Sequence, residues 1–352
     1  MPVAYRLNAN PNWRYTGIEM KHMTTRALSL AGAALLSALL STTAFAQDLT
    51  KVTVRLAFIA GGIDAPFFVA KSKGYFEAEG LDVDIIDGTG STDTIQAVGN
   101  GSVQLGNAGI GALAQASAQA KFDNITAVFG LVQKDPSSII SLKGSGIKEP
   151  KDLEGRKFAT EAGNFSDGMI GAFAAVNGVN LDTFELIVTD NYMQALLKGD
   201  ADFINAWANP DGDKVAVFAE IEEPMLFADY GVNLLGSSVI VRKDWLAANE
   251  DAVKGYLRAI TKAHDDVLAD PAEALDLFMQ NRPDADRESI GKEIEVMEKY
   301  RHTARTEGKP FGYVDGEDLK QTISLLETYA GIPTGWATPE MVYTDKYLPV
   351  AE

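Results

Sequence analysis

The sequence predicts an α/β protein with two domains, each built on a parallel-rich sheet flanked by helices. The first observation behind this prediction is that apolar runs of strand length alternate with helical patterns from residue 52 to residue 241. The second is a complete strand–helix–strand unit near the start of this region, which places its two strands in parallel. The third is length, because residues 47–352 are enough for two domains or one large one.

The strand–helix–strand unit begins with an apolar strand, Val52–Ile59. A helix is expected next, because Asp64 suits the residue that caps a helix and Pro66 suits its first turn. Gly80 is typical of the end of a helix. The alternation of apolar residues with aspartates over Leu81–Ile85 then predicts the second strand.

The later elements follow from the same two patterns, joined by turns rich in Gly, Ser and Thr. Apolar runs bounded by turn residues predict strands at Val103–Gly106, Ile125–Val132, Ser138–Leu142, Phe158–Thr160, Phe184–Val188, Ala201–Ala206, Pro224–Phe227 and Val239–Val241. Helical spacing predicts helices at Gly109–Ala120, Asn191–Lys198, Asp244–Asn249, Asp251–Leu268, Pro271–Met279, Asp286–Tyr300 and Gly316–Tyr329, with a further helix ending at Val176. Another helix is expected to be capped by Ser91 and to end at Asn100 and Gly101.

The segment APFFVAKSKGYFEAEGLDVDI, residues 65–85, resembles the first strand–helix–strand unit of the NMT1/THI5-like periplasmic substrate-binding proteins. That group serves ABC importers for nitrate, sulfonates, and pyrimidine or flavin precursors. Asp152–Thr160 resembles the group's entry into its second domain, and Glu340–Pro349 resembles the tail of its pyrimidine-precursor binders. The resemblance implies a type II periplasmic-binding-protein-like fold, with a ligand cleft between two α/β domains joined by two crossovers.

The domain boundaries follow from these segments. Residues 1–46 are expected to be an upstream segment and signal peptide, because a basic start and an apolar run precede the small residues around Phe45. Domain I is expected to be discontinuous, at 48–136 and 236–352, and domain II to cover 137–235. Cleavage of the signal peptide would leave a periplasmic protein.

Composition excludes several classes of function. The chain has 49 acidic and 31 basic residues, a formal net charge of −18, and such a surface repels nucleic acid and anionic lipid. It has no Cys and three His, and it contains no zinc-ligand spacing, P-loop or nucleophile elbow. We therefore expect no metal, no cofactor and no nucleic-acid partner. The resemblance implies that fungal relatives which make a pyrimidine use a Cys-rich motif and an active-site His, so we expect that this chain is not an enzyme.

The candidate ligand-binding residues lie in the turns that follow strands, at the carboxyl edge of each sheet, where open α/β folds bind ligands. In the first domain they are Gly62, Asp64, Phe67, Thr89, Ser91, Thr92, Asn107 and Gly109. In the second domain they are Asn164, Phe165, Ser166, Asn191, Tyr192, Trp207 and Asn209. Three aromatic residues among them, Phe165, Tyr192 and Trp207, offer faces on which a flat ring can stack.

These turns contain several aspartates and no Lys or Arg, which favours a nitrogen heterocycle over an anion. We therefore expect a monomeric protein that captures a pyrimidine-like compound or another nitrogen heterocycle and delivers it to an ABC permease in the inner membrane. A sulfonate or nitrate binder of the same fold is one alternative. A sensor-domain partner and an enzyme acting on a small heterocycle are two others, and turnover of a bound compound would distinguish the enzyme.

Overall fold

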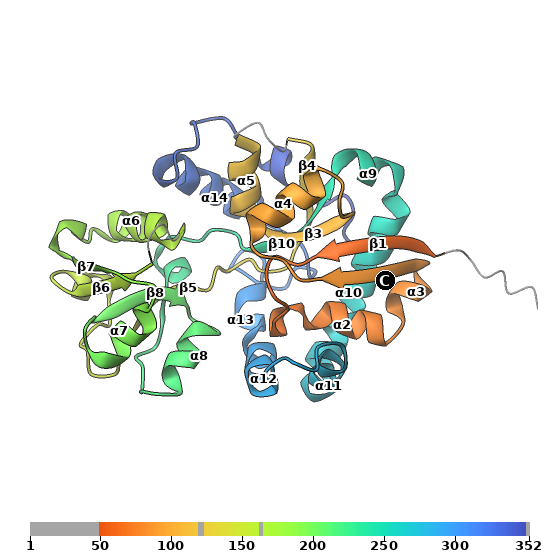
Figure 1. Cartoon of the computed structure of the whole chain (residues 1–352). Helices are drawn as coiled ribbons and strands as arrows, with labels where there is room; N and C mark the ends of the chain where they lie inside the picture. Colours follow the sequence, from red (N-terminus) through yellow and green to blue (C-terminus); the bar gives the residue numbers. More distant parts are fainter. Residues whose placement is uncertain (1–48, 119–122, 162–164, 350–352) are drawn as a thin grey trace, which may run out of the picture. The chain divides into compact units, whose positions relative to one another are not determined.

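The computed structural model describes residues 49–118, 123–161 and 165–349, without the side chains of residues 165–168 (Figure 1). Residues 49–352 belong to one compact unit that contains two five-stranded sheets. The predicted signal peptide at 1–46 lies outside the described residues. Among the residues that are described, no helix has both the length and the apolar character that crossing a membrane requires.

The first sheet has the strand order β2-β1-β3-β10-β4. Its strands are β1 (Thr50–Arg55), β2 (Leu81–Ile86), β3 (Leu105–Gly109), β4 (Ile125–Gly130) and β10 (Ser237–Arg242). β1 pairs in parallel with β2 and with β3, as the strand–helix–strand pattern predicts. β10 lies between β3 and β4 and is antiparallel to both.

The second sheet has the order β7-β6-β8-β5-β9. Its strands are β5 (Ser137–Ser141), β6 (Lys157–Thr160), β7 (Glu185–Val188), β8 (Phe203–Trp207) and β9 (Met225–Leu226). β6 pairs in parallel with β7 and β8, and β5 is antiparallel to β8 and β9. Both sheets are therefore mixed. The antiparallel strands are β5, the first strand after the chain enters the second sheet, and β10, the first strand after it returns to the first sheet.

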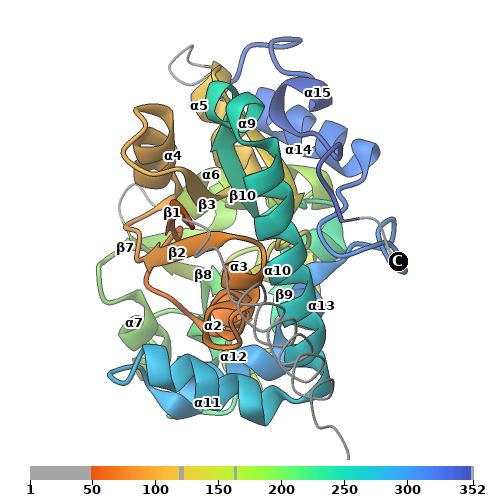
Figure 2. The same ribbon diagram turned by 90° about the vertical axis from the view of Figure 1, so that its right-hand side faces the viewer.

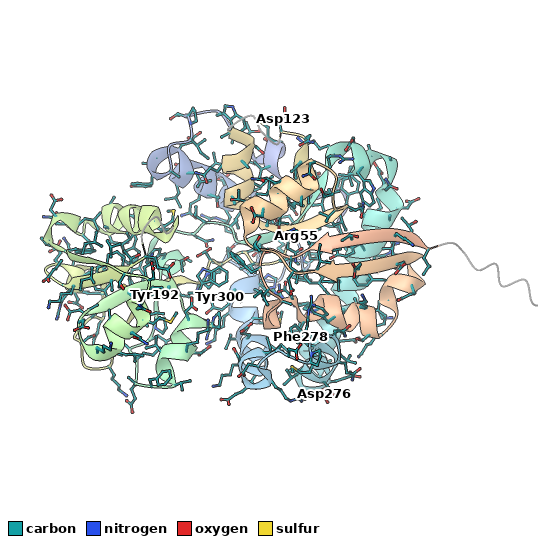
Figure 3. The ribbon with its side chains drawn as sticks, in the orientation of Figure 1. Arg55, Asp123, Tyr192, Asp276, Phe278 and Tyr300 are labelled. Carbon is teal, nitrogen blue, oxygen red and sulfur yellow. The ribbon has the colours of Figure 1, made fainter. Side chains whose placement is uncertain are left out.

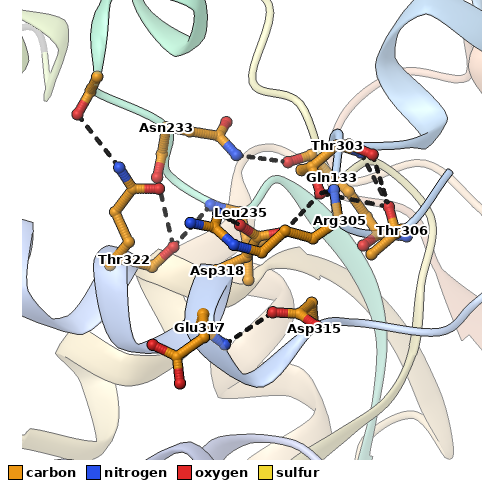
Figure 4. Close-up of polar contacts among 12 residues, drawn as sticks. Gln133, Asn233, Leu235, Thr303, Arg305, Thr306, Asp315, Glu317, Asp318 and Thr322 are labelled. Carbon is orange, nitrogen blue, oxygen red and sulfur yellow. Dashed lines mark hydrogen bonds and ion pairs between the residues drawn. The ribbon is translucent and has the colours of Figure 1, made fainter.

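Two crossovers connect the sheets, where the sequence predicts them. The chain leaves the first sheet after Gly130 and returns to it at Ser237. Asn233 ties the two crossovers together. Its side-chain oxygen accepts from the Asp135 N–H at 2.9 Å. Its amide donates to the Gln133 carbonyl at 2.8 Å (Figure 4). We retain the division into domain I and domain II as a proposal, since each sheet draws its strands from one of them.

Helices cover the sheets. The α-helices are α2 (Ala65–Ser72), α3 (Tyr75–Ala78), α4 (Ser91–Gly99), α5 (Ile110–Ala118), α6 (Phe165–Asn177), α7 (Tyr192–Lys198), α8 (Asp211–Ala216), α9 (Lys243–Ala248), α10 (Glu250–Ala269), α11 (Pro271–Asn281), α12 (Arg287–Val296), α13 (Glu298–Arg301), α14 (Gly316–Tyr329) and α15 (Pro339–Val342). Short 3₁₀ turns are η1 (Gly62–Asp64), η2 (Pro150–Leu153), η3 (Leu181–Thr183) and η4 (Phe227–Tyr230).

The core follows the alternation of side chains along each strand. In β10, Val239 and Val241 join a cluster made with α2, α10, α11 and α12, and the long helix α10 runs along this side of the sheet (Figure 2). Ile240 points to the opposite face and joins a cluster made with α4, α5, α14 and α6. A third, smaller cluster lies between the second sheet and α7 and α8. Because α6 of the second sheet shares a cluster with the first sheet, the two sheets are packed through a common set of apolar residues.

Several local details differ from the sequence prediction, among them the predicted helix Asp286–Tyr300, which divides into α12 and α13. β1 ends at Arg55, four residues before Ile59, and residues 57–61 become a loop instead. The expected single helix after this loop divides into α2 and α3, because Gly74 adopts the left-handed conformation with φ of 71°. Ser91 does not cap α4 through its side chain, since its hydroxyl accepts from the Gly109 N–H at 3.1 Å.

Candidate ligand cavity between the sheets

A cavity of about 870 Å³ is lined by residues from both sheets. Its first wall consists of the β1–η1 loop, the turn before α4, and the start of α5. Its second wall includes the end of β8 and the start of α7. Residues of the two crossovers line the cavity between the two walls. The loops that follow β1, β2, β3 and β8 thus meet in one place, as expected for the carboxyl edges of parallel strands.

Carboxylates hold the β1–η1 loop through three consecutive backbone N–H groups. The N–H of Ala60 donates to the Asp87 carboxylate at 3.1 Å, and the N–H of Gly61 donates to Asp64 at 3.1 Å. The N–H of Gly62 donates to Glu293 of α12 at 2.6 Å. The Asp64 side chain therefore accepts from a residue before it and does not cap α2, which corrects the sequence prediction.

Two aromatic side chains meet across the cavity. Trp207, at the end of β8, is 43% exposed, and its ring lies edge-on to Phe58 of the first wall, with 6.1 Å between ring centroids. Tyr192 lines the second wall at the start of α7 (Figure 3), and burial raises the pKa of its phenol to about 12. Tyr192 therefore stays a neutral hydroxyl at physiological pH and can donate or accept a hydrogen bond.

The lining of the cavity is acidic. Its carboxylates come from five residues, namely Asp64, Asp93, Asp135, Asp211 and Glu293. Burial raises the pKa of Asp64 to about 6, and burial also raises the pKa values of Asp135 and Glu293. Among the described residues that line the cavity there is no Lys, Arg or His. A ligand in this site therefore meets hydrogen-bond acceptors and negative charge, which no cation balances within the described part of the lining.

Seven of the residues predicted from the sequence line this cavity. They are Asp64, Thr89, Ser91, Thr92, Gly109, Tyr192 and Trp207. Asn164 lies outside the described residues, and Phe165 and Ser166 are described only as the backbone that begins α6. The assignment of the whole set as ligand-binding residues stays a prediction.

Five predicted residues are not part of the cavity lining. Phe67 is 1% exposed and packs beside Tyr256 in the core, and Asn107 is buried within β3. Gly62 packs directly against α12, where a Cβ atom would lie 2.5 Å from Cβ of Glu293. Asn191 is exposed in the turn before α7. Asn209 accepts from the hydroxyl of Tyr300 at 2.6 Å, so it connects the β8–α8 turn to α13.

Sequence reasoning missed four lining residues that matter for the chemistry of the cavity. Phe58 was assigned to a strand, although it lies beyond the end of β1. Asp135 lies in a crossover, and Asp211 is the first residue of α8. Glu293 reaches the Gly62 N–H from 231 residues further along the chain, and no local pattern marks that pairing. The acidic character of the candidate turns was the one sequence signal that pointed toward this lining.

The two mixed sheets, the paired crossovers and the cavity between them define a protein of the periplasmic-binding-protein fold. The periplasmic aliphatic sulphonate binding protein SsuA from Escherichia coli has this fold, with a TM-score of 0.65 and 15% identity over 85% of this chain and 99% of that chain. Residues 64–274 match the family described as NMT1/THI5 like, and the chain belongs to that family. The family membership predicted from residues 65–85 is thereby confirmed.

Two curated relatives carry different kinds of name. A protein of Aspergillus parasiticus named 4-amino-5-hydroxymethyl-2-methylpyrimidine phosphate synthase is 28% identical over 66% of this chain and 71% of its own length. The riboflavin-binding protein RibY of Chloroflexus aurantiacus is 23% identical over 86% of this chain and 87% of its own length. The family therefore includes proteins named as enzymes and proteins named as binders.

These names contradict the expectation that the chain is not an enzyme. Several relatives, from fungi and from Legionella pneumophila, are named as the same pyrimidine phosphate synthase. The expectation rested on the absence of Cys, which excludes thiolate chemistry only. Carboxylates and a phenol remain in the cavity, so the lack of one residue type did not justify excluding catalysis.

Proposed function

We propose that this protein is an extracytoplasmic solute-binding protein that captures a nitrogen heterocycle and delivers it to an ABC importer. A signal peptide at 1–46 would export the chain, and the monomeric protein would hold its ligand between the two sheets. The observation that carries the proposal is the cavity lining, which combines the aromatic faces of Phe58, Tyr192 and Trp207 with five carboxylates. Ring N–H and amino groups donate hydrogen bonds to carboxylates, and a flat ring stacks on aromatic side chains.

The hydrogen bonds of the β1–η1 loop favour a heterocycle over a sulfonate or nitrate as the ligand. Consecutive backbone N–H groups near a helix start are suited to bind an anion. Here the N–H groups of Ala60, Gly61 and Gly62 already donate to Asp87, Asp64 and Glu293. An anionic ligand at this wall would have to displace a carboxylate, and it would also face the remaining negative charges with no cation among the described lining residues.

We expect calorimetry to show binding of 4-amino-5-hydroxymethyl-2-methylpyrimidine or of riboflavin, and none of taurine or nitrate. The two heterocycles are chosen because relatives are named for a pyrimidine phosphate and for riboflavin. A binding compound should also raise the melting temperature, since it binds the folded state only. Tight binding of taurine or nitrate, with no binding of either heterocycle, would contradict the proposal.

A second candidate is a reaction on the bound heterocycle, favoured by the relatives named as synthases. The same samples decide between the two candidates. After prolonged incubation with the protein, mass spectrometry of the recovered compound should show it unchanged if the protein only binds. A product that accumulates beyond the molar amount of protein would establish turnover.

Trp207→Ala should weaken binding of the compound by about 0.5–1.5 kcal/mol beyond the loss of buried area, because one stacking face is removed. Stability should change little, since Trp207 is exposed and its ring contact is with Phe58 at the cavity. Calorimetry and thermal unfolding measure the two effects separately. The matched control is Phe218→Ala, since Phe218 is 77% exposed and does not line the cavity. A Trp207→Ala protein that unfolds and is not rescued by ligand would identify Trp207 as a core residue.

A further inference from the structure

Arg301 is a buried cation directly behind the cavity wall. It lies at the end of α13 and is fully buried, and it is absent from the cavity lining. Burial lowers the pKa of its guanidinium to about 10, so the group remains charged at neutral pH. Its ring neighbour is Phe311, whose centroid lies 5.0 Å from the guanidinium carbon. A charge held this deep requires hydrogen-bond partners that repay its desolvation.

Those partners are two segments of the cavity. One Nη atom donates to the carbonyl of Leu131 at 2.6 Å, in the crossover that follows β4. The other Nη atom donates to the carbonyl of Ile63 at 2.9 Å, in η1. Ile63, Asp64 and the adjacent Val132 all line the cavity. The planar fork of one guanidinium therefore joins two walls of the site, a geometry that a single ammonium group cannot reproduce.

The charge of Arg301 lies near titratable groups of three elements. Burial raises the pKa of Asp64 in η1, and the nearby carboxylates of Glu293 and Asp87 add to this rise, whereas the hydrogen bond from the Gly61 N–H and then the positive charge of Arg301 oppose it. Glu298 of α13 places an oxygen 3.7 Å from Nε of Arg301. The imidazole of His264 in α10 shares that Glu298 oxygen at 2.8 Å. The hydroxyl of Tyr256, also in α10, is the remaining titratable group that faces Asp64.

We infer that Arg301 is a positioning residue for the ligand site: it fixes η1 against the first crossover and supplies the positive charge that faces the Asp64 carboxylate. The inference rests on the proposed binding function, because it assigns Asp64 the role of accepting a hydrogen bond from the ligand. In this arrangement no cation that would attract anions lines the cavity among the described residues, while the cation one layer behind favours the ionised form of Asp64.

Arg301→Met should move the pH dependence of binding to higher pH. In the intact protein, affinity for the heterocycle should fall as pH drops through about 6, where Asp64 becomes protonated. Without the positive charge, the pKa of Asp64 rises, and the midpoint should move up by about one pH unit, with up to about tenfold weaker binding on the acid side of the transition. Calorimetry between pH 5 and pH 8.5 measures both curves, and protonation of the compound affects them equally.

Arg301→Lys keeps the positive charge but removes the guanidinium that holds the two carbonyls, so it tests the two roles of Arg301 separately. It should keep the midpoint of the intact protein and bind more weakly at every pH, because one ammonium cannot hold both carbonyls. The control is Arg287→Met, which removes an exposed Arg paired with Asp276, outside the cavity lining, and should change neither quantity. An unchanged midpoint in Arg301→Met would overturn the inference. Wild-type affinity in Arg301→Lys would also overturn it, and this second test remains available if Arg301→Met does not fold.

A measurement without ligand keeps this inference separate from the proposed function. The titration of the Asp64 carboxyl carbon can be followed by NMR, with its signal identified by its loss in Asp64→Asn. The Asp64 pKa should be higher in Arg301→Met than in the intact protein or in Arg301→Lys. If no compound of the panel binds, the proposed function fails and this titration still decides the role of Arg301.

Discussion

Phe67→Ala should lower the free energy of unfolding by about 3–5 kcal/mol, the usual cost of truncating a buried Phe. Phe67 is 1% exposed, and its ring lies 6.3 Å from that of Tyr256 and nearly parallel to it, in the cluster that joins α2 to the first sheet and α10. The substitution would leave a cavity in this cluster, which the surrounding helices can fill only in part. Protein that remains folded should bind the heterocycle with unchanged affinity.

Chemical denaturation of Phe67→Ala, together with calorimetry on the folded protein, tests this expectation. Phe218→Ala is again the control, because removal of a largely exposed ring should change stability by less than about 0.5 kcal/mol. The sequence prediction placed Phe67 at the ligand. Loss of binding without loss of stability would support that prediction and would remove Phe67 from the core.

Gly62→Ala should reduce both stability and affinity. An added Cβ atom would lie 2.5 Å from Cβ of Glu293, 2.7 Å from the backbone nitrogen of Ile294 and 2.8 Å from the carbonyl oxygen of Ile290. Two of these atoms are helix backbone and cannot rotate away, so η1 must separate from α12. Overpacking of this kind costs about 1–3 kcal/mol. The movement also displaces Asp64 and breaks the hydrogen bond from the Gly62 N–H to Glu293.

Gly171→Ala is the matched control for Gly62→Ala. Gly171 lies inside α6, and no atom lies within 4 Å of the position that its Cβ would take. Ala in place of Gly within a helix should raise the free energy of unfolding by up to about 1 kcal/mol. Thermal unfolding of both variants should therefore give changes of opposite sign. Wild-type stability and affinity in Gly62→Ala would show that η1 and α12 are not in close contact.

Sequence patterns predicted the sheets well because each strand carries its own signal. Burial on both faces makes β4 mostly apolar, and the alternation of β2 marks its exposed face. The crossovers were located because strand patterns on either side of them are clear. The antiparallel direction of β5 and β10 was not predicted, since hydrophobic patterning reports which face of a strand is buried and says nothing of its direction.

The cavity could be predicted only as far as local turns define it. Asp64 and Ser91 line it because they follow strands in the sequence, and Trp207 lines it because it ends β8, so all three lie at a sheet edge. Phe67 shows the limit of this reasoning, because it is only a few residues from the edge but belongs to the buried face of α2. Glu293 was missed for the opposite reason, since its place at the cavity depends on how α12 packs against η1.

The position of β10 has a consequence for the order in which the chain folds. β3 and β4 are not paired with each other, because β10 lies between them, so the first sheet is divided until residue 242 has been synthesised. Every strand of the second sheet lies within residues 137–226, and that sheet can form earlier. The first sheet therefore begins first but is completed last, after the second sheet. Until then, the strands made first have open edges, which are the parts of a nascent chain most exposed to incorrect pairing.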